Sequence, residues 1–417
     1  MALRVLLIGD LHLGRRPVRF PPENTQPSRG TWGQALSARA AWERTVELAL
    51  EREVHAALLA GDVVEKNEDR FQAFGPLEAG VGRLRKAGIE VLGVAGNHDD
   101  IALPRLARAI DGFRFLGEGG VFELACVETG GGAFGVLGWS FPERVYRKNP
   151  LERLGEELRR KVDAFCGGPV LGLLHTQIGG GEKSYAPTRQ ADLESIGVSG
   201  WFLGHVHQPS LAAGRVAAGT RPLGYLGSVS ACDIGEAGPR GPWLATIEDG
   251  RLARLEQLVL TPVRFERLVL DLSPFDGASE SLVDDATDAL RKGAARLAEE
   301  AAGAVRPPEA LALRLVLTGR HARHRELVQH FETLVQEAEW SYSPSGIVCY
   351  LEGLEDDARP ALDLEELAET QGPIGLMARR VRELEDAAPE EPDADDARML
   401  RVARDLLEDL IAVKEGS

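Results

Sequence analysis

The segment LRVLLIGDLH, residues 3–12, joins an apolar run of strand length to Asp10 and His12. A second run, residues 56–60, ends in the same way at Asp62. Short apolar runs bounded by glycine are typical of strands that are buried on both faces. Open α/β sheets place their functional sites at the C-terminal ends of such strands. The two runs therefore predict neighbouring strands that present acidic side chains at one edge of a sheet.

Three further apolar runs lead to polar side chains. They are residues 90–95 before Asn97, His98 and Asp99, residues 170–174 before His175, and residues 201–203 before His205 and His207. Each piece alone is weak, because a lone Gly-Asp is usually a turn and a lone histidine is more often structural. Together, however, the five pieces hold five of the nine histidines of the chain. Carboxylates, imidazoles and one amide suit a pair of divalent cations of intermediate hardness better than calcium alone.

In order, the five pieces read D-x-H, G-D, G-N-H-D, H and G-H-x-H, a pattern that closely resembles the calcineurin-like metallophosphoesterase superfamily. The resemblance implies an α/β (α+β) fold in which two β-sheets pack face to face and are flanked by helices. It also implies two divalent metal ions, with manganese (Mn²⁺) expected and Mg²⁺, Fe²⁺ or Zn²⁺ as alternatives. By position, it assigns Asp10, His12, Asp62 and His207 to the first metal, and Asp62, Asn97, His175 and His205 to the second.

The same resemblance implies roles for two residues outside the ligand set. His98 is expected to face the scissile phosphate as electrophile or general acid, and Asp99 to orient the His98 imidazole. A water shared by the two metals is expected to lose its proton near neutral pH and to attack phosphorus in line with the departing alkoxide. The resemblance therefore implies a hydrolase, a dinuclear-metal phosphodiesterase.

Segments outside the metal motifs narrow the resemblance. Residues 41–62, 184–187 and 225–228 resemble the SbcD/YhaO group of DNA repair exonucleases. This implies a DNA exonuclease or endonuclease that acts with a separate SMC-like ATPase such as SbcC or YhaN, and a homodimer is expected from the group. One position departs from the group. Where the relatives often read G-D-L-F-H at the second motif, this chain has Glu65 in place of the final histidine. The endonuclease behaviour of those relatives on hairpins or broken ends is therefore in doubt for this chain.

Thr261-Pro262 marks a predicted domain boundary. Residues 1–260 are expected to form the catalytic domain, residues 261–352 a small α+β capping domain for DNA recognition, and residues 353–417 an acidic helical tail that binds the partner. The capping domain is predicted as strand 264–272, helix 279–302, strand 311–318, helix 323–338 and strand 346–351. The tail is predicted as helices 361–386 and 395–413 with a linker over 388–396, and helices that pack on their own domain are the alternative to partner docking.

The net charge of −17 is concentrated towards the C-terminus, because the last 67 residues of the chain, from Leu351 onward, hold 20 Asp and Glu against 8 Lys and Arg. The acidity of the whole chain therefore does not exclude DNA, since phosphate binding depends on local basic surface. Arg15, Arg16 and Arg19 lie in a proline-rich loop shortly after His12. This loop is a candidate for contact with the DNA backbone, with a solvated loop as the alternative.

No apolar run approaches the ~20 residues needed to span a bilayer, and the N-terminus lacks a signal-peptide pattern. The four cysteines are scattered without a C-x-x-C pair, which fits a reducing compartment. These features predict a cytoplasmic enzyme without membrane association.

Two other function classes remain open. A metallophosphoesterase for cyclic nucleotides, nucleotides or phosphoproteins would use the same metals, but it would need neither the basic capping module nor the tail. A scaffold with vestigial metals would have no reason to retain His98 beside a complete ligand set.

Overall fold

The computed structural model describes residues 2–28, 30–181, 183–338, 340–361, 364–387 and 394–415. The chain forms two compact units. The first comprises Met1–Leu268, Leu290–Leu315 and Thr333–Leu354, and the second comprises Val269–Ala289, Val316–Glu332 and Glu355–Ser417. Within the described residues, no helix combines the length and the apolar character that crossing a bilayer requires.

Two β-sheets form the centre of the first unit. The seven-stranded sheet has the order β11 (Gly214–Arg215), β14 (Arg251–Gln257), β13 (Trp243–Glu248), β1 (Leu3–Ile8), β2 (Ala56–Ala60), β3 (Glu90–Val94) and β4 (Phe113–Phe115). The five-stranded sheet has the order β12 (Leu223–Tyr225), β10 (Gly200–Gly204), β7 (Val170–His175), β6 (Gly132–Trp139) and β5 (Glu123–Thr129). Strands β1 to β4 run parallel to one another, as do β6, β7, β10 and β12. The predicted α/β fold with two packed sheets is confirmed.

The alternation of side chains along β1 shows how this sandwich is built. Val5 and Leu7 join a core that lies between the two sheets and includes Leu173 of β7. Leu6 and Ile8 point to the opposite face and join the core beneath the helices. Successive side chains of a strand point to opposite faces, so a strand covered on both sides must be apolar at nearly every position. The continuous apolar runs in the sequence follow from this double burial.

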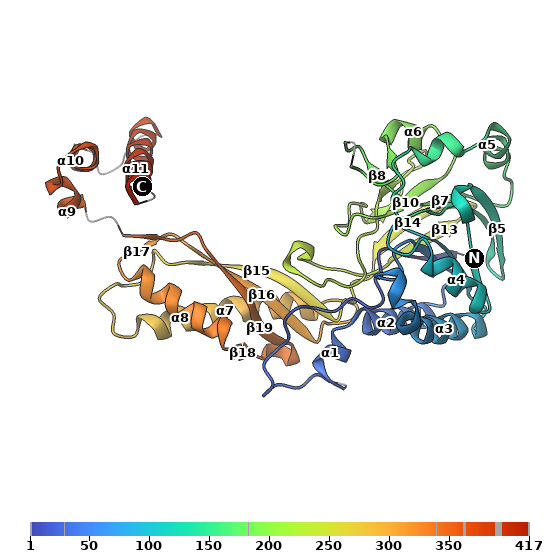
Figure 1. The fold of residues 1–417 in the computed structure, drawn as a ribbon, viewed down its shortest axis with the longest axis horizontal. Coiled ribbons are helices and arrows are strands. Elements are labelled where there is room, and N and C mark those ends of the chain that lie inside the picture. Colours follow the sequence, from blue (N-terminus) through green and yellow to red (C-terminus); the bar gives the residue numbers. More distant parts are fainter. Residues whose placement is uncertain are drawn as a thin grey trace. The chain divides into compact units, whose positions relative to one another are not determined.

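Helices cover the outer face of each sheet. The helices on the seven-stranded sheet are α2 (Ala38–Glu51), α3 (Arg70–Lys86) and α4 (Ala102–Ala109), whereas α5 (Glu156–Asp163) and α6 (Gln190–Glu194) pack on the five-stranded sheet. Figure 1 shows these two groups on opposite sides of the sheets, with the short α1 (Trp32–Ala35) leading into α2. Short strands β8 (Gln177–Ile178) and β9 (Pro187–Thr188) pair in the loops after β7.

The region after residue 262 forms the predicted β-α-β-α-β order, and its sheet contains one short strand more than predicted. Its sheet has the order β15 (Val263–Asp271), β16 (Ala310–Thr318), β19 (Val348–Asp356) and β18 (Ser341–Tyr342), and its helices are α7 (Leu282–Ala302) and α8 (His324–Gln336). Residues of these elements belong to both units. In the first unit, Phe265, Ala312 and Tyr350 pack with Trp32 and Leu36 of the N-terminal loop and α1. The second unit also pairs β17 (Arg320–His321) with β20 (Arg359–Pro360).

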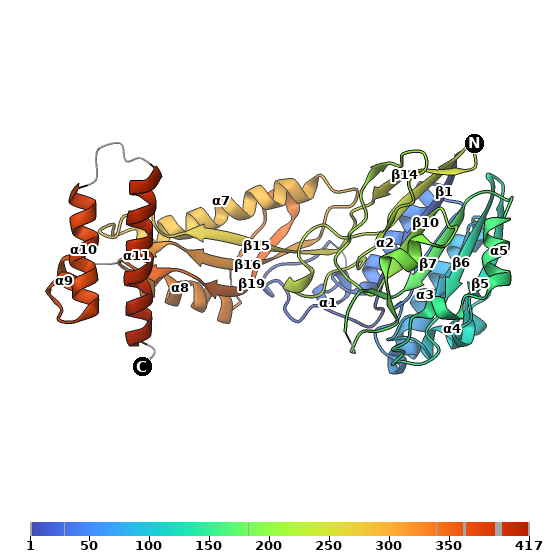
Figure 2. The ribbon, with the colours of Figure 1, turned by 90° about the horizontal axis from the view of Figure 1, so that it is seen from above.

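The described residues of the tail form three helices, whereas two were predicted from the sequence. They are α9 (Leu364–Glu369), α10 (Pro373–Ala387) and α11 (Ala394–Glu415). The predicted single helix 361–386 is wrong, because Gly372 has a φ of 101° and Pro373 starts a new helix. Figure 2 shows α10 and α11 side by side, and Ala378 and Leu407 are buried between them. Most of the predicted linker, residues 388–393, lies outside the described residues.

Packing of α2 against α3 generates a stability prediction. A methyl group added at Gly80 would lie 2.3 Å from Nε1 of the buried Trp42, whereas one added at Gly82 in the same helix meets nothing within 4 Å. Gly80→Ala should lower the free energy of unfolding by about 1–3 kcal/mol through overpacking. Gly82→Ala should raise it by about 0.5–1 kcal/mol, because alanine favours a helix interior over glycine. Urea unfolding followed by near-UV circular dichroism checks both, and equal effects of the two substitutions would contradict the packing.

Candidate metal centre

The polar residues predicted from the strand ends meet at one edge of the two sheets. Asp10, Asp62 and Asn97 follow β1, β2 and β3 of the seven-stranded sheet, whereas His175 ends β7 and His205 follows β10 of the five-stranded sheet. The pairs β1–β2, β2–β3 and β7–β10 are parallel, and both strands of each pair lead to a polar residue at their C-terminal ends. Because their carboxyl ends share one edge, the polar side chains face each other across the sandwich.

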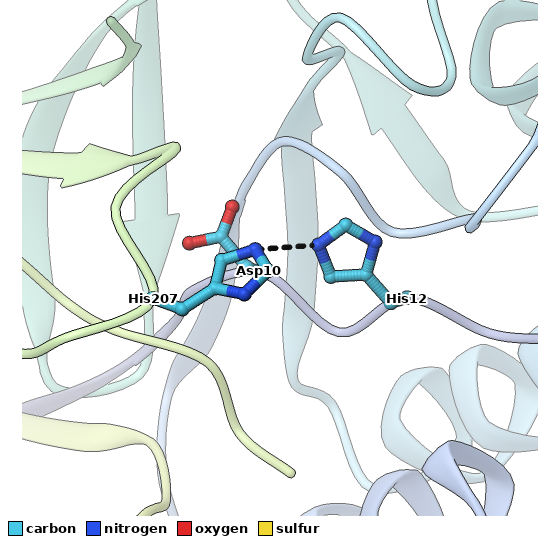
Figure 3. Close-up of side chains that lie close together, drawn as sticks. All are labelled: Asp10, His12 and His207. Carbon is cyan, nitrogen blue, oxygen red and sulfur yellow. Dashed lines mark hydrogen bonds between the residues drawn. The ribbon is translucent and has the colours of Figure 1, made fainter. Parts of the chain in front are cut away.

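One cluster of side chains contains Asp10, His12 and His207, whose potential ligand atoms all lie within 4.8 Å of one another. Nε2 of His12 lies 3.0 Å from Nε2 of His207 (Figure 3). This is the set of residues that the sequence predicted for the first metal, apart from the shared Asp62.

A second cluster lies on the other side of Asp62. The Asp62 Oδ2 atom is 3.3 Å from Nε2 of His175, and Oδ1 of Asn97 is 3.1 Å from the same nitrogen. Oδ1 of Asn97 also lies 3.1 Å from Nδ1 of His205. Asp62 Oδ2 is in addition 3.9 Å from Nε2 of His12, so this carboxylate lies between the two clusters. The structure thus brings together all seven predicted ligands, with Asp62 in the position of a bridge.

The spacing of these atoms fits bound metal ions. Metal bonds of about 2.0–2.2 Å to nitrogen or oxygen place neighbouring ligand atoms about 3–3.5 Å apart, which matches the 3.0–3.3 Å separations at this site. The facing nitrogens of His12 and His207 give a second indication. Each ring has a carboxylate close to its Nδ1 atom, which favours a proton there and leaves a lone pair on each Nε2. Two lone pairs that face each other at this distance suit a cation that both nitrogens bind.

Three groups fix the orientation of the imidazoles from behind. His175 Nδ1 lies 3.1 Å from the carbonyl oxygen of Ala60. His207 Nδ1 lies 3.0 Å from Oε1 of Glu236, and His12 Nδ1 lies 2.8 Å from Oε2 of Glu65. In metal sites such partners set the tautomer and raise the basicity of the ligand nitrogen.

Close approach of the backbone makes this arrangement possible. A Cβ atom at Gly61 would lie 2.6 Å from Nδ1 of His175, and one at Gly96 would lie 2.1 Å from Oδ1 of Asp62. Asp62 and His12 themselves have left-handed φ values of 47° and 50°. Such conformations cost free energy in residues with side chains and are found where function requires them.

Charge at the centre favours cations. Burial by itself would raise the pKa of the Asp62 carboxyl, but His175 and then His12 outweigh burial and lower it. Burial alone would likewise lower the pKa of His175, yet the carboxylates of Asp62 and Asp10 raise it to about 9. Carboxylates that favour a proton on a buried imidazole favour a metal ion at the same place.

The structure places His98 at the centre but corrects the predicted role of Asp99. The His98 ring lies 5.2 Å from that of His12, and its Nδ1 atom is 2.7 Å from the carbonyl oxygen of Glu65. Asp99 instead accepts hydrogen bonds from the backbone N–H groups of Val63, Val64 and Gly96. It is fully buried and ties the loop after β2 to the loop after β3. The carbonyl of Glu65 therefore orients His98, and Asp99 positions the two loops that carry Asp62 and Asn97.

The three candidate arginines have different surroundings. Arg15 pairs with Asp233 at 2.8 Å and with the buried Glu236 at 2.5 Å, so its guanidinium holds a carboxylate that lies behind His207. Contact of Arg15 with DNA stays a prediction. Arg19 is exposed and donates to the carbonyl oxygen of Val335 at 3.2 Å. Arg16 is exposed.

Two residues of the site were missed in the sequence. Burial would raise the pKa of Glu236, but the hydrogen bond from His207 and the charge of Arg15 lower it to about 2, so this carboxylate is ionised at neutral pH. Arg240 is fully buried and donates to the carbonyl oxygen of His207 and to Gln208, which fixes the loop after β10. In the sequence, Glu236 and Arg240 stand out only as charged residues among mostly small or apolar neighbours. Neither belongs to a spaced motif that would indicate a role at the site.

Comparison with known proteins agrees with this geometry. Residues 3–209 match the family model described as calcineurin-like phosphoesterase. The chain is 26% identical over 261 residues to the uncharacterized metallophosphoesterase YhaO of Bacillus subtilis (strain 168), and the aligned region covers 61% of either chain.

Several solved structures show partial similarity. The protein TT1561 of Thermus thermophilus is 13% identical with a TM-score of 0.37, and the match covers 62% of this chain and 99% of that one. A dimetal phosphatase from Danio rerio (LOC 393393) is 14% identical with a TM-score of 0.36, covering 59% and 93%. The purple acid phosphatase PPD1 of yellow lupin is 12% identical with a TM-score of 0.38, covering 61% and 53%.

Residues 3–209 therefore form a domain of the calcineurin-like phosphoesterase family. Within it, the similarity to YhaO confirms the group that the sequence motifs indicated. The matched family is one of phosphoesterases, and the two clusters around Asp62 offer the side chains that could hold a dinuclear metal centre.

Removal of the central charge tests the ligand assignment. Asp62→Asn should leave fewer than two metal ions per chain and lower the hydrolysis of bis(p-nitrophenyl) phosphate at least ~100-fold, because both clusters lose their shared carboxylate. Asp100→Asn is the matched control, since Asp100 accepts from the Asn67 amide near the same loop and does not face the clusters. Metal content after gel filtration in Mn²⁺ measures the effect, and two retained ions in Asp62→Asn would contradict the bridge.

Proposed function

We propose that the chain is a metal-dependent DNA nuclease of DNA repair, which hydrolyses phosphodiester bonds as an exonuclease or endonuclease and acts with an SMC-like ATPase. The observation that most supports this proposal is that the inner residues of the metal centre are buried whereas its outer residues are partly exposed. Asp10, Asp62 and His175 are 0–2% exposed, whereas His98, His205 and His207 are half-buried and form its solvent side. A centre that is reachable from solvent suits a phosphodiester within a large polymer.

The chain supplies the parts that phosphodiester hydrolysis needs. Bound divalent cations lower the pKa of water toward neutrality and stabilise negative charge on the phosphate oxygens. With its Nδ1 proton directed at the Glu65 carbonyl, the His98 ring turns Nε2 away from that contact. A proton on this nitrogen can stabilise charge on the phosphate or pass to the departing oxygen. The backbone N–H of His98 donates to Oδ1 of Asp62 at 2.9 Å, which holds the imidazole at a fixed distance from the centre.

Manganese is the metal we propose, with Mg²⁺, Fe²⁺ and Zn²⁺ as alternatives. The site offers histidine nitrogens together with carboxylate and amide oxygens. This mixture suits first-row divalent metals, because sites for Mg²⁺ or Ca²⁺ are built mainly from oxygen.

The regions beyond the catalytic domain support a polymer substrate and a protein partner. The predicted division into a catalytic domain (1–260), a capping domain (261–352) and a tail (353–417) is part of this proposal. In the second unit, Met399, Val402 and Leu406 of α11 and Leu376 of α10 are exposed apolar residues. We propose that this surface docks on a helical segment of the ATPase, since amphipathic helices bind through apolar side chains at such spacing. Homodimerisation is expected from the group.

Activity on DNA is the first measurement. The purified chain with Mn²⁺ should degrade end-labelled single- or double-stranded oligonucleotides and turn over bis(p-nitrophenyl) phosphate. His98→Ala should lower both rates about 10²–10⁴-fold and keep both metals, because an acid catalyst is lost without a ligand. Loss of metal in this variant would show that His98 is a ligand. Turnover of the small ester with DNA intact, even after addition of the ATPase, would favour the alternative of a small-substrate metallophosphoesterase.

Partner docking is tested on the exposed face of α11. Leu406→Glu places a charge on a side chain that is 48% exposed, so the fold should tolerate it while ATPase binding weakens at least ~10-fold. Asp405→Ser on the same helix is the control, because Asp405 is also exposed and polar. Binding of a YhaN-like ATPase to immobilised chain measures the effect, and equal binding of both variants would contradict docking through this surface.

A further inference from the structure

The two metal positions differ in the charge that surrounds them. The carboxylate of Asp10 lies with His12 and His207 in the first cluster and also within 4.8 Å of Asp62 and His175. The neutral amide of Asn97 contacts only histidines of the second cluster, His175 and His205. Asp62 lies between the clusters and contributes to both. The directly bound groups alone therefore attract a cation more strongly to the first position.

The groups behind the imidazoles increase this difference. At the first position, Glu65 lies behind His12 at 2.8 Å and Glu236 lies behind His207 at 3.0 Å. At the second position, the nearest partner of His175 Nδ1 is the neutral carbonyl of Ala60 at 3.1 Å. The nearest carboxylate to that nitrogen is Asp10 at 3.7 Å, which is itself a ligand of the first position.

Arg15 opposes this effect only in part. Its guanidinium lies 2.5 Å from Glu236 and 3.5 Å from Nδ1 of His207, so it offsets some of the negative charge at the first position. Asp233, at 2.8 Å from the same guanidinium, balances Arg15 in turn. Arg240, which donates to the carbonyl oxygen of Glu236, adds a second positive charge there. Asp233 and Glu236 balance the two arginines, so Glu65 supplies the net negative charge behind the ligands of the first position. Glu65 and Glu236 are the two carboxylates directed at ligand imidazoles of that position. A carboxylate behind a ligating imidazole raises the metal affinity of that imidazole.

We propose that the two metal positions fill in order, with the position formed by Asp10, His12 and His207 filled first, and that Glu65 and Glu236 are the positioning residues that set this order. At limiting metal the chain holds one ion at the first position, and the second ion binds only at a higher metal concentration. Glu65, the position at which this chain departs from its relatives, thereby acts on metal binding through His12.

Electron paramagnetic resonance of the wild-type chain tests the order without any substitution. Metal-free protein is titrated with Mn²⁺, and the spectra of isolated ions and of coupled ion pairs are followed. At half an equivalent, the chain should show isolated Mn²⁺ only, and coupled pairs should appear above one equivalent. Coupled pairs at half an equivalent would overturn sequential filling.

Substitutions then identify which position fills first. His205→Asn should keep one tight Mn²⁺ and lose the weak step, whereas His207→Asn should lose the tight step. Glu65→Gln and Glu236→Gln should each weaken the tight step about 10–100-fold in calorimetric titration. The control is Glu68→Gln, which removes an exposed charge close to Glu65 in sequence. An unchanged tight step in both glutamine variants, or retention of that step in His207→Asn, would overturn the proposal.

Discussion

Asp62 can reach both clusters of ligands only because no side chain separates β2 from β3 and β7 at this edge. Gly61 brings the backbone against the His175 ring, and Gly96 brings the next loop against the Asp62 carboxylate, each at distances that a Cβ atom would not permit. Asp99 then holds the two loops together through three backbone N–H groups. The positions of the bridging carboxylate, of Asn97 and of His98 all depend on this close packing of backbone.

The sequence predicted the strand ends well because a single physical cause determines them. A strand covered on both faces is apolar throughout, so its first polar residue marks the point at which it leaves the core. Strands β1 and β2 have the predicted limits, and β3, β7 and β10 differ by one or two residues. His175 ends such a strand, and each of the other ligands follows one within four residues.

The roles of Asp99, Glu236 and Arg15 could not be predicted in the same way. Asp99 is adjacent to His98 in the sequence, yet its carboxylate points to backbone groups of another loop. Glu236 reaches His207 across 29 positions of chain, through a loop whose path follows from the burial of Arg240. Contacts of this kind depend on loop conformation, which has no period in the sequence. Gly372-Pro373 marks the break between α9 and α10 in the sequence. Apolar residues at helical spacing on both sides of it nevertheless favoured one continuous helix.

The metal centre is also a joint between the two sheets. Asp10, Asp62 and Asn97 belong to loops of the seven-stranded sheet, whereas His175 and His205 belong to the five-stranded sheet, and mainly apolar packing joins the sheets beneath them. A cation held by ligands from both sides is a removable cross-link at the edge of the sandwich. Since such a ligand stabilises only the closed state, the resistance of this domain to heat becomes a function of the free metal concentration around it. The cell's metal supply would then govern how long the enzyme persists as well as how fast it works.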